Sequence, residues 1–432
     1  MPDAVAISDG AKALPPSAWE RPSLRLTGLF GTLVCLGTVM VASTAAGADP
    51  TDAQFAGAVV RQLLLTAFGV IAFVAAACVD YRFWHRHRTL LATLALGSLV
   101  AVLVPGVGTE INWARRWLRF SSTFVCQPSE FAKVALIIWM AAYCARAART
   151  PDLRTGQPLI RSFAWGFLVP GAVAVVAGGL VLLEPDFGTC LLIVVLCMAV
   201  MLVCGTRPLF PLLAALAAVP LVLKLVVDTP YRLDRVMIFL DPWRDPDQKG
   251  YQLIQSLIAV GSGGLTGKGL GLGAQKMGFV PAAPSDFIFS IVGEELGFLG
   301  ALCVLAIYGW ILWEGLKVAL RAGNTYAFAL AFGITALIGL QAAVNLAVVT
   351  GLVPTKGLSL PLVSAGGSSL CATLWAAGIL VNIARSEEGP PGSETCPAYE
   401  GVPCYERWFR GAGRTVLALV RPGAGLRGRW EA

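Results

Sequence analysis

The chain contains little charge. Asp, Glu, Lys and Arg make up only 14% of its 432 residues, whereas 56% are hydrophobic. Soluble domains carry about 25% charged residues, so this composition excludes an ordinary soluble protein. A membrane hydrocarbon core takes roughly 20 apolar residues per helical crossing. The chain therefore has room for about ten crossings within one integral domain.

Other signatures are missing, and each absence removes a class of function. The only histidines are His85 and His87, and most of the eleven cysteines fall inside apolar stretches, which indicates no disulfide framework. The glycines from Gly261 to Gly273 lack the strand, turn and helix of a nucleotide loop, so we expect an irregular or re-entrant segment there. The net charge of +7 comes without a recognisable nucleic-acid module, so no nucleic-acid partner is indicated.

Ten apolar windows bounded by charge or by Pro and Gly are present instead. They predict an all-α polytopic membrane protein whose membrane domain covers residues 24–385. Residues 1–23 are polar and contain proline, which predicts a cytoplasmic segment and no signal peptide. Residues 386–432 predict a disordered cytoplasmic tail with a basic membrane-surface segment. The windows are 24–46, 62–79, 89–105, 131–148, 163–183, 188–204, 208–227, 287–313, 326–350 and 366–384.

The distribution of arginine predicts the orientation. Arg82, Arg86 and Arg88 separate the second and third windows, and basic residues recur in every second connection after them. The positive-inside rule places these connections and both termini in the cytoplasm. The segment 228–286 then becomes a large extracytoplasmic loop between the seventh and eighth helices. Its cations lie on the unfavoured side, which indicates an anionic ligand. Pairing with local acidic residues is the alternative for its scattered lysines.

Four motifs follow one another along the chain. They read N-W-A-R-R-W at 112–117 with Q-P-S-E-F-A-K at 127–133, E-P-D-F-G-T at 184–189, a stretch from F-L-D-P-W at 239–243 to E-E-L-G at 294–297, and G-L-V-P-T-K-G-L-S-L-P at 351–361. In order and content they resemble the SEDS family of cell-wall proteins. The P-T-K-G form resembles the cell-division and sporulation members more than the elongation members.

The resemblance implies a peptidoglycan glycosyltransferase that polymerises lipid II into β-1,4 glycan strands at the outer face of the inner membrane during cell division. It implies a class B penicillin-binding protein, which is a transpeptidase, and other division proteins as partners at the septum. A lipid II transporter remains an alternative, because carriers also have many helices with buried charges. A non-catalytic scaffold that recruits a transpeptidase is a second alternative. A divalent cation, Mg²⁺ or Mn²⁺, would help to neutralise diphosphate, but the sequence holds no multi-carboxylate cage for one.

Asp286 is the expected catalytic residue. The reaction needs a base, and both histidines lie in a predicted cytoplasmic connection. Asp286 stands directly before the eighth window and matches the essential acidic position of the family. An N-cap role at the following helix is the alternative reading of the sequence. Residues 281–286 read P-A-A-P-S-D, so the Glu and His that usually precede this acid in the family are absent.

The other predicted site residues would bind the substrate and its diphosphate. Arg115 and Arg116 suit phosphate because a guanidinium group matches its oxygens bidentately. Glu130 and Lys133 lie three residues apart near the start of a predicted helix, where they either pair or face a polar cavity. Asp186 has an ordinary turn role as an equal alternative. The remaining members of the set are Arg232, Lys276 and Lys356.

Overall fold

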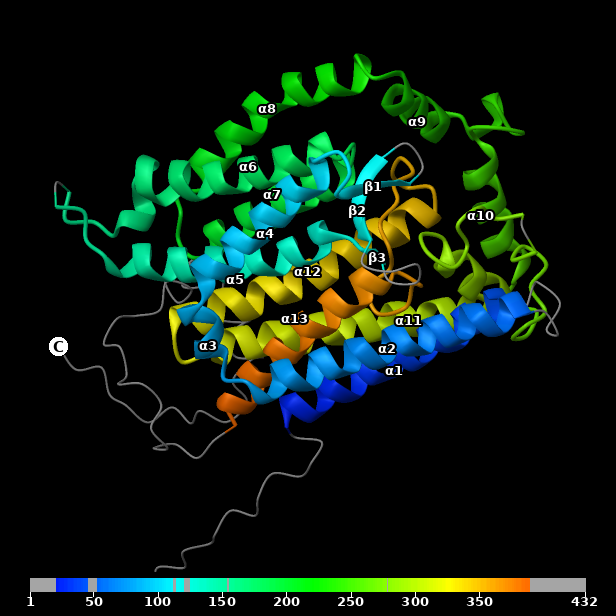
Figure 1. Cartoon of the computed structure of the whole chain (residues 1–432), viewed down its shortest axis with the longest axis horizontal. Helices are drawn as coiled ribbons and strands as arrows, with labels where there is room; N and C mark the ends of the chain where they lie inside the picture. Colours follow the sequence, from blue (N-terminus) through cyan, green and yellow to red (C-terminus); the bar gives the residue numbers. More distant parts are fainter. Residues whose placement is uncertain are drawn as a thin grey trace, which may run out of the picture.

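The computed structural model of the chain is a bundle of long helices (Figure 1). A small sheet and the segment after α8 lie toward one end of this bundle. The predicted terminal segments, 1–23 and 386–432, lie almost wholly outside the described residues. The structure describes residues 21–45, 53–111, 114–119, 125–153, 155–277 and 279–388.

Each of the ten apolar windows falls on a helix. Among the described residues, eight helical stretches are long and apolar enough to cross a membrane, whereas α4 and α7 have only 16 and 17 residues. The prediction of an all-helical polytopic membrane protein is confirmed, and a count of ten crossings stays a prediction. The ten helices are α1 (Pro22–Ala45), α2 (Ala53–Cys78), α4 (Arg88–Leu103), α5 (Pro128–Arg149), α6 (Val169–Leu183), α7 (Phe187–Val203), α8 (Leu209–Val227), α11 (Ile288–Arg321), α12 (Thr325–Val349) and α13 (Gly367–Ser386).

Short elements connect these helices. The helix α3 (Tyr81–Arg86) lies in the connection that was expected to be cytoplasmic, and the 3₁₀ turn η2 (Leu159–Arg161) precedes a π-helical turn, η3 (Ala164–Leu168), that runs into α6. The segment 228–286, predicted as one large loop, contains α9 (Pro230–Leu240), η4 (Pro242–Arg244) and α10 (Tyr251–Ser262). Irregular backbone follows α10, as the glycines there predict.

Two predicted windows differ from their helices. The helix α2 begins at Ala53, well before the predicted start at residue 62. The helix α11 continues to Arg321, beyond the predicted end at residue 313, and it is broken at Gly297, where φ is 69° and ψ is −168°. A positive φ with extended ψ is open essentially to glycine alone, so Gly297 divides α11 into two helical segments.

A three-stranded antiparallel sheet, which was not predicted, precedes α5. Its strands β1 (Gly108–Ile111), β2 (Ala114–Arg119) and β3 (Val125–Cys126) lie in sequence order. Because successive side chains of a strand point to opposite faces, Arg115 and Arg116 on β2 cannot serve the same site. The sheet thus separates the two arginines that the sequence had placed together.

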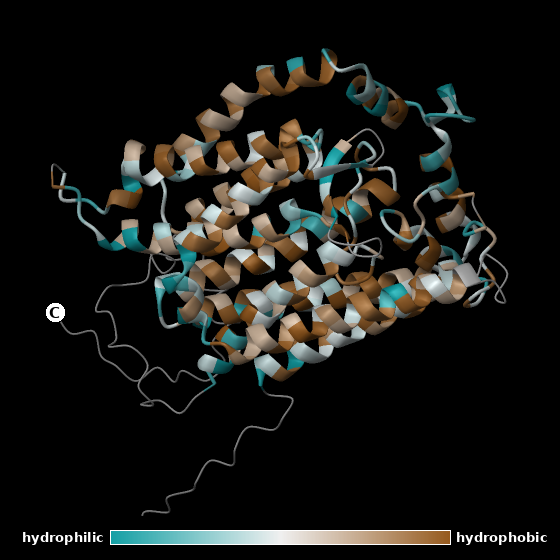
Figure 2. Ribbon diagram, viewed as in Figure 1, coloured by the Kyte–Doolittle hydropathy of each residue, from teal (hydrophilic) through white to brown (hydrophobic). Residues whose placement is uncertain are grey.

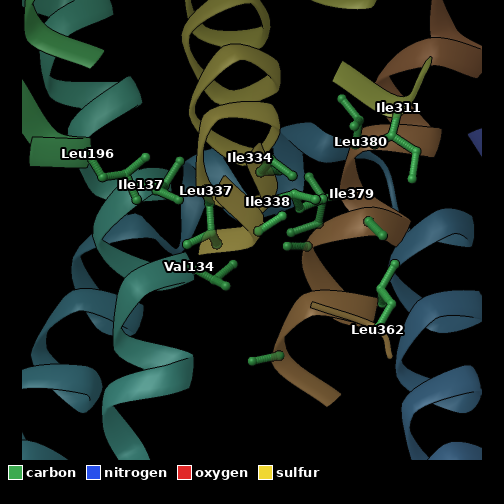
Figure 3. Close-up of a cluster of buried hydrophobic side chains, with 14 of the residues drawn as sticks. Val134, Ile137, Leu196, Ile311, Ile334, Leu337, Ile338, Leu362, Ile379 and Leu380 are labelled. Atoms are coloured by element: carbon green, nitrogen blue, oxygen red, sulfur yellow. The ribbon is translucent and has the colours of Figure 1, made fainter. Parts of the chain in front are cut away.

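The core is built around α12. Most side chains of α5, α12 and α13 are buried, whereas few of those on α2 and α8 are, and more than half of the residues on these two helices are exposed. Figure 2 shows hydrophobic residues along the helices and hydrophilic ones gathered toward their ends. Branched side chains from several helices meet in the middle of the bundle, including Val134 and Ile137 of α5 against Ile334 and Ile338 of α12 (Figure 3). The exposed apolar faces of α2 and α8 are those that lipid would cover.

Candidate active site

Asp286 ends the irregular segment that leads into α11. It is half-buried, and no side chain among the described residues donates a hydrogen bond to its carboxyl group. The N-cap of α11 is Phe287, which makes no side-chain cap bond, so the N-cap reading of Asp286 is wrong. Gly357 approaches it so closely that a Cβ there would lie 3.0 Å from Oδ2 of Asp286. The carboxyl group is thus free to act on a ligand.

The electrostatic surroundings of Asp286 favour a base. Burial raises the pKa of its carboxyl group to about 6, and Asp186 adds to this rise. The charges of Arg235 and Arg116 oppose it by stabilising the carboxylate. A pKa near 6 leaves the group mostly ionised at neutral pH while keeping it able to accept a proton, which is the balance that general bases need.

Cations from the segment after α8 and from the loop before α13 gather beside the start of α7. Lys356 places its ammonium nitrogen 4.5 Å from the ring centre of Phe187, and Arg232 places its guanidinium carbon 5.5 Å from the same ring. Arg235 donates to the carbonyl oxygen of Thr355 at 2.8 Å and also binds the hydroxyl of Tyr231. None of the three has a salt bridge to an acidic residue among the described part of the chain.

Burial lowers the pKa of Lys356, although Asp186 opposes the shift. Its ammonium group and the guanidinium of Arg235 also repel one another, which adds to the lowering. Several cations placed this close together repel one another, and an anion bound among them would offset this repulsion. The arrangement therefore suits diphosphate.

The turn between α6 and α7 contributes acidic groups and Arg116. Arg116 donates from Nε to the carbonyl oxygen of Glu184 and from Nη2 to that of Pro185, both at 2.7 Å. Asp186 caps α7 by accepting from the backbone N–H and hydroxyl of Thr189, at 3.0 and 2.8 Å. Its predicted turn role is therefore present in the structure, while its charge still acts on Asp286 and Lys356.

Glu184, in the same turn, is fully buried, and neither of its carboxyl oxygens has a hydrogen-bond partner among the described residues. Burial, with a smaller contribution from Asp186, raises the pKa of this group to about 8. Arg116 opposes the shift. The carboxyl group is therefore mostly protonated at neutral pH, and Asp286 is the more ionised of the two acids.

Arg115 and Lys276 lie apart from this cluster. Arg115 is exposed and pairs with Glu110 on the neighbouring strand, with 3.3 Å between Nε and Oε2. Lys276 is buried and pairs with Glu295, with 2.9 Å between Nζ and Oε1. Neither is among the charges that shift the pKa of Asp286. The structure therefore brings Arg116, Asp186, Arg232 and Lys356 together with Asp286, but not these two.

Glu130 and Lys133 pair inside the bundle. Their charged atoms are 2.8 Å apart, both side chains are buried, and Lys133 also donates to the amide oxygen of Gln341 at 2.9 Å. Gln341 in turn donates to the carbonyl oxygen of Ser359 at 3.1 Å. The pair thus supports the loop before α13 through Gln341. Of the two predicted arrangements, pairing or facing a polar cavity, the structure shows pairing.

Asn345, one helical turn after Gln341 on α12, joins the segment that ends at Asp286 to the loop before α13. Its amide nitrogen donates to the carbonyl oxygen of Asp286 at 2.8 Å and to that of Leu358 at 2.6 Å. Because the two acceptors are both carbonyls, only the nitrogen of the amide can face them. One side chain therefore ties the segment that carries Asp286 to the one that carries Lys356.

Sequence reasoning missed Arg235, Gln341 and Asn345 as site residues. Arg235 was included only among the unnamed cations of the segment 228–286, although its spacing of three from Arg232 places both on one side of a helix. The amides Gln341 and Asn345 interrupt an otherwise apolar window four residues apart. Paired polar residues on one face of a membrane helix are a usable signal for a buried network.

The described residues contain no group of three or more His, Cys, Asp or Glu side chains placed to hold a metal ion. Asp186 caps α7, and Glu184 is buried and mostly protonated, which leaves Asp286 as the one available carboxylate among the described acids of the cluster, so the donor set does not form a cage for Mg²⁺ or Mn²⁺. We therefore assign the neutralisation of bound phosphate to the arginine and lysine side chains.

Comparison with known proteins agrees with this geometry. Residues 24–389 match the model of the cell cycle protein family that groups FtsW, RodA and SpoVE. The chain belongs to this family. The prediction of SEDS membership is therefore confirmed, because the match covers the whole helical domain. The matched range also includes all four motifs and every residue of the cluster around Asp286.

Curated relatives in the family cover most of the chain. A probable peptidoglycan glycosyltransferase FtsW from Geobacter metallireducens is 39% identical over 374 residues, which are 86% of this chain and 97% of that protein. The stage V sporulation protein E of Bacillus subtilis is 39% identical over 366 residues, which are 84% of this chain and 97% of that protein. Relatives named for cell division and for sporulation thus match the chain at the same identity.

Solved structures in the family share the fold. A chain from a peptidoglycan synthase complex, studied for its coordination of polymerization and crosslinking, superimposes with a TM-score of 0.67 at 31% identity. The match covers 84% of this chain and 97% of that one. The rod shape determining protein RodA of Thermus thermophilus superimposes with a TM-score of 0.61 at 28% identity, covering 84% and 96% of the two chains.

Proposed function

We propose that this protein is a peptidoglycan glycosyltransferase that polymerises lipid II into β-1,4 glycan strands. The observation that carries the proposal is the carboxyl group of Asp286, which has no donor among the described residues and lies in the field of several cations. A base beside a diphosphate-binding group is what glycosyl transfer from a lipid diphosphate requires. The names of the curated relatives support the same activity.

In the proposed reaction, the carboxylate of Asp286 accepts the proton of the 4-hydroxyl group of an incoming lipid II. That oxygen forms a bond to the anomeric carbon of the growing strand as the bond from this carbon to the diphosphate breaks. The leaving diphosphate carries the electron pair of the broken bond. Arg116, Arg235 and Lys356 stabilise its charge, and Asp286 afterwards releases its proton to water.

The supporting residues keep these groups in place. Asn345 fixes the backbone of Asp286 against Leu358, and Gln341 fixes Ser359. Lys133, paired with Glu130, holds Gln341 by donating to its amide oxygen. Preorganised groups need no rearrangement during the reaction, so the polar network inside the bundle contributes to the rate by positioning.

The cellular setting is also proposed. We infer that the cluster faces the outside of the inner membrane, that both termini are cytoplasmic, and that the protein acts at the division septum. The proposed partner is a class B penicillin-binding protein, together with other division proteins. The similarity to a chain from a complex that polymerises and crosslinks peptidoglycan supports a transpeptidase partner.

The test is polymerisation by the purified chain. We expect the full-length protein with its class B partner to convert lipid II into glycan strands, which are separated by gel electrophoresis after the peptides are labelled. Asp286→Ala should form no strands while keeping the fold of the wild-type chain. Wild-type protein that forms no strands but moves fluorescent lipid II between leaflets would replace this proposal with the transporter. Normal strand formation by Asp286→Ala would disprove the assigned mechanism.

A further inference from the structure

The segment 261–280, which we call the glycine loop, contains the end of α10 and the irregular backbone after it, and it exposes several large apolar side chains. It contains no Asp or Glu. Five of its six large apolar side chains are between 49% and 71% exposed, and only Val280 is buried, although exposed positions in a loop are usually polar. These exposed residues are Leu265, Leu270, Leu272, Met277 and Phe279.

Many polar groups of the loop are bound by two acidic residues of α11, although Ser262, Thr266 and Lys268 are exposed. Glu294 accepts from the backbone N–H groups of Ala274 and Gln275, and Glu295 accepts from that of Gly271 at 3.1 Å. Both glutamates are buried. Lys276 pairs with Glu295, and Lys268 pairs with Glu294 at 2.8 Å. Two buried carboxylates thus satisfy much of the loop's backbone and both of its lysines.

Backbone hydrogen bonds join the loop to the break in α11. The N–H groups of Lys268 and Gly269 donate to the carbonyl oxygens of Glu294 and Glu295, both at 3.0 Å. In return, Phe298 donates to the carbonyl of Gly264 at 2.9 Å. A Cβ on Gly267 would lie 2.2 Å from the carbonyl oxygen of Glu295, so this approach requires glycine. The break at Gly297 exposes backbone groups, and the loop satisfies them.

The length of α11 sets the depth of this junction. From Phe298 to Lys317 the helix rises about 30 Å at about 1.5 Å per residue, which equals the hydrocarbon thickness of a typical bilayer. With Lys317 and Arg321 at one boundary, Gly297 lies at the other. Phe298 and Leu299 are more than half exposed, so the lipid-facing surface of α11 begins where the loop attaches.

We infer that the glycine loop is embedded in the membrane leaflet at this end of the bundle, with its leucines, Met277 and Phe279 among the acyl chains. Backbone tolerates that environment only where its polar groups are satisfied within the protein, and here Glu294 and Glu295 satisfy them. The apolar surface of the loop continues that of α11, which is long and apolar enough to cross a membrane. Continuity with this surface and the depth of Gly297 favour lipid over a protein as the occupant.

The experiment places an environment-sensitive fluorescent amino acid at single positions of the full-length protein in phosphatidylglycerol and phosphatidylethanolamine nanodiscs. Probes go at Leu265 and Leu272, with Phe279 as a third position. Leu299 is the lipid-facing control. Leu153, which is fully exposed in the connection after α5, is the aqueous control. All five positions are exposed, so the fold should tolerate the probe, and a thermal unfolding midpoint close to that of the wild-type chain checks this.

Two quenchers then locate each probe. We expect lipids brominated near the headgroup end of the acyl chain to quench the loop probes about as strongly as Leu299, and acrylamide to quench them weakly. Leu153 should show the reverse pattern. Loop probes that behave like Leu153 would overturn the inference. A loop that acrylamide reaches in the chain alone, and that only an added partner protein protects, would also overturn it, because the occupant would then be protein.

Discussion

Two charged regions at the same end of the molecule differ in how their charges are satisfied. In the junction between the glycine loop and α11, Lys276 and Glu295 are 1% and 0% exposed, and Ser43 donates to Glu295 at 2.6 Å. In the cluster around Asp286, the carboxyl group of this residue has no donor in the described part of the chain, and Lys356 lies over an aromatic ring. Both regions hold lysine and acid close together. Only in the junction between the glycine loop and α11 are the charges paired without a ligand.

This difference separates structural charge from functional charge. A buried ion pair with further hydrogen bonds has little left to offer a substrate, and removing one partner leaves the other uncompensated. Half-buried charges without partners add little to the fold and are available for binding and proton transfer. We therefore expect Lys276 to contribute to stability and Asp286 to the proposed chemistry, although sequence reasoning had placed both in the substrate site.

The largest expected effect is on activity at Asp286. Asp286→Asn keeps the shape of the side chain but removes the base, so the rate of strand formation should fall about 10²-fold to 10⁴-fold. The unfolding midpoint in detergent should stay close to that of the wild-type chain, because no hydrogen bond to the carboxyl group is lost. A variant that lost stability and activity in parallel would show that the group is structural.

The converse effect is expected at Lys276. Lys276→Met leaves Glu295 buried without its cation, which should reduce the free energy of unfolding by about 3–5 kcal/mol. The activity of the molecules that remain folded should be unchanged, as measured per folded molecule after size-exclusion chromatography. Lys268→Met is the matched control. Lys268 is partly exposed, so its replacement should reduce the free energy of unfolding by less. A stable but inactive Lys276→Met would restore Lys276 to the substrate site.

Asn345 tests whether the segment that ends at Asp286 and the loop before α13 must be held together. Asn345→Ala leaves the carbonyl oxygens of Asp286 and Leu358 without their donor. This should lower the free energy of unfolding by about 1–3 kcal/mol for each buried group left unpaired. We expect about a tenfold or larger fall in kcat with a smaller change in KM, since the positions of reacting groups change more than their identity. Asn345→Asp has the same shape but no donor, so it should be as defective as Asn345→Ala. Normal kcat in Asn345→Asp would exclude amide donation as the cause.

Much of the fold was predictable because hydropathy is a local property. All ten windows fall on helices, and the turn between the windows 163–183 and 188–204 is found between α6 and α7. Asp286 was identified from a motif read along the chain. The sheet was missed because strands of four, six and two residues carry too little periodic signal.

The charge partners were not predictable, since they depend on tertiary structure. Lys276 and Glu295 are 19 residues apart and meet only because Gly297 breaks α11 and lets the glycine loop pair with it. Arg115 and Arg116 are neighbours in sequence, but β2 directs them to Glu110 and to the turn before α7. The two arginines therefore have different partners, which no motif distinguishes.

The smallest expected effect is a shift in the pH dependence of catalysis. In the proposed mechanism Asp286 acts as a base in its ionised form, so kcat should fall as the pH is lowered through about 6. Arg235 lowers the pKa of Asp286, so Arg235→Gln should move this acidic limb to higher pH. Asp186 raises that pKa, so Asp186→Asn should move the limb to lower pH, and asparagine still caps α7 well.

The two shifts have opposite signs, which a general loss of packing would not produce. Profiles of kcat against pH at saturating lipid II report the pKa of the base in the enzyme with substrate bound. At saturation, weaker diphosphate binding in Arg235→Gln does not affect the position of the acidic limb. Arg115→Gln is the control, since Arg115 is exposed, pairs with Glu110 and is not among the charges that act on Asp286. Limbs that moved together in both variants, or moved equally in Arg115→Gln, would mean that a group other than Asp286 controls the pH dependence.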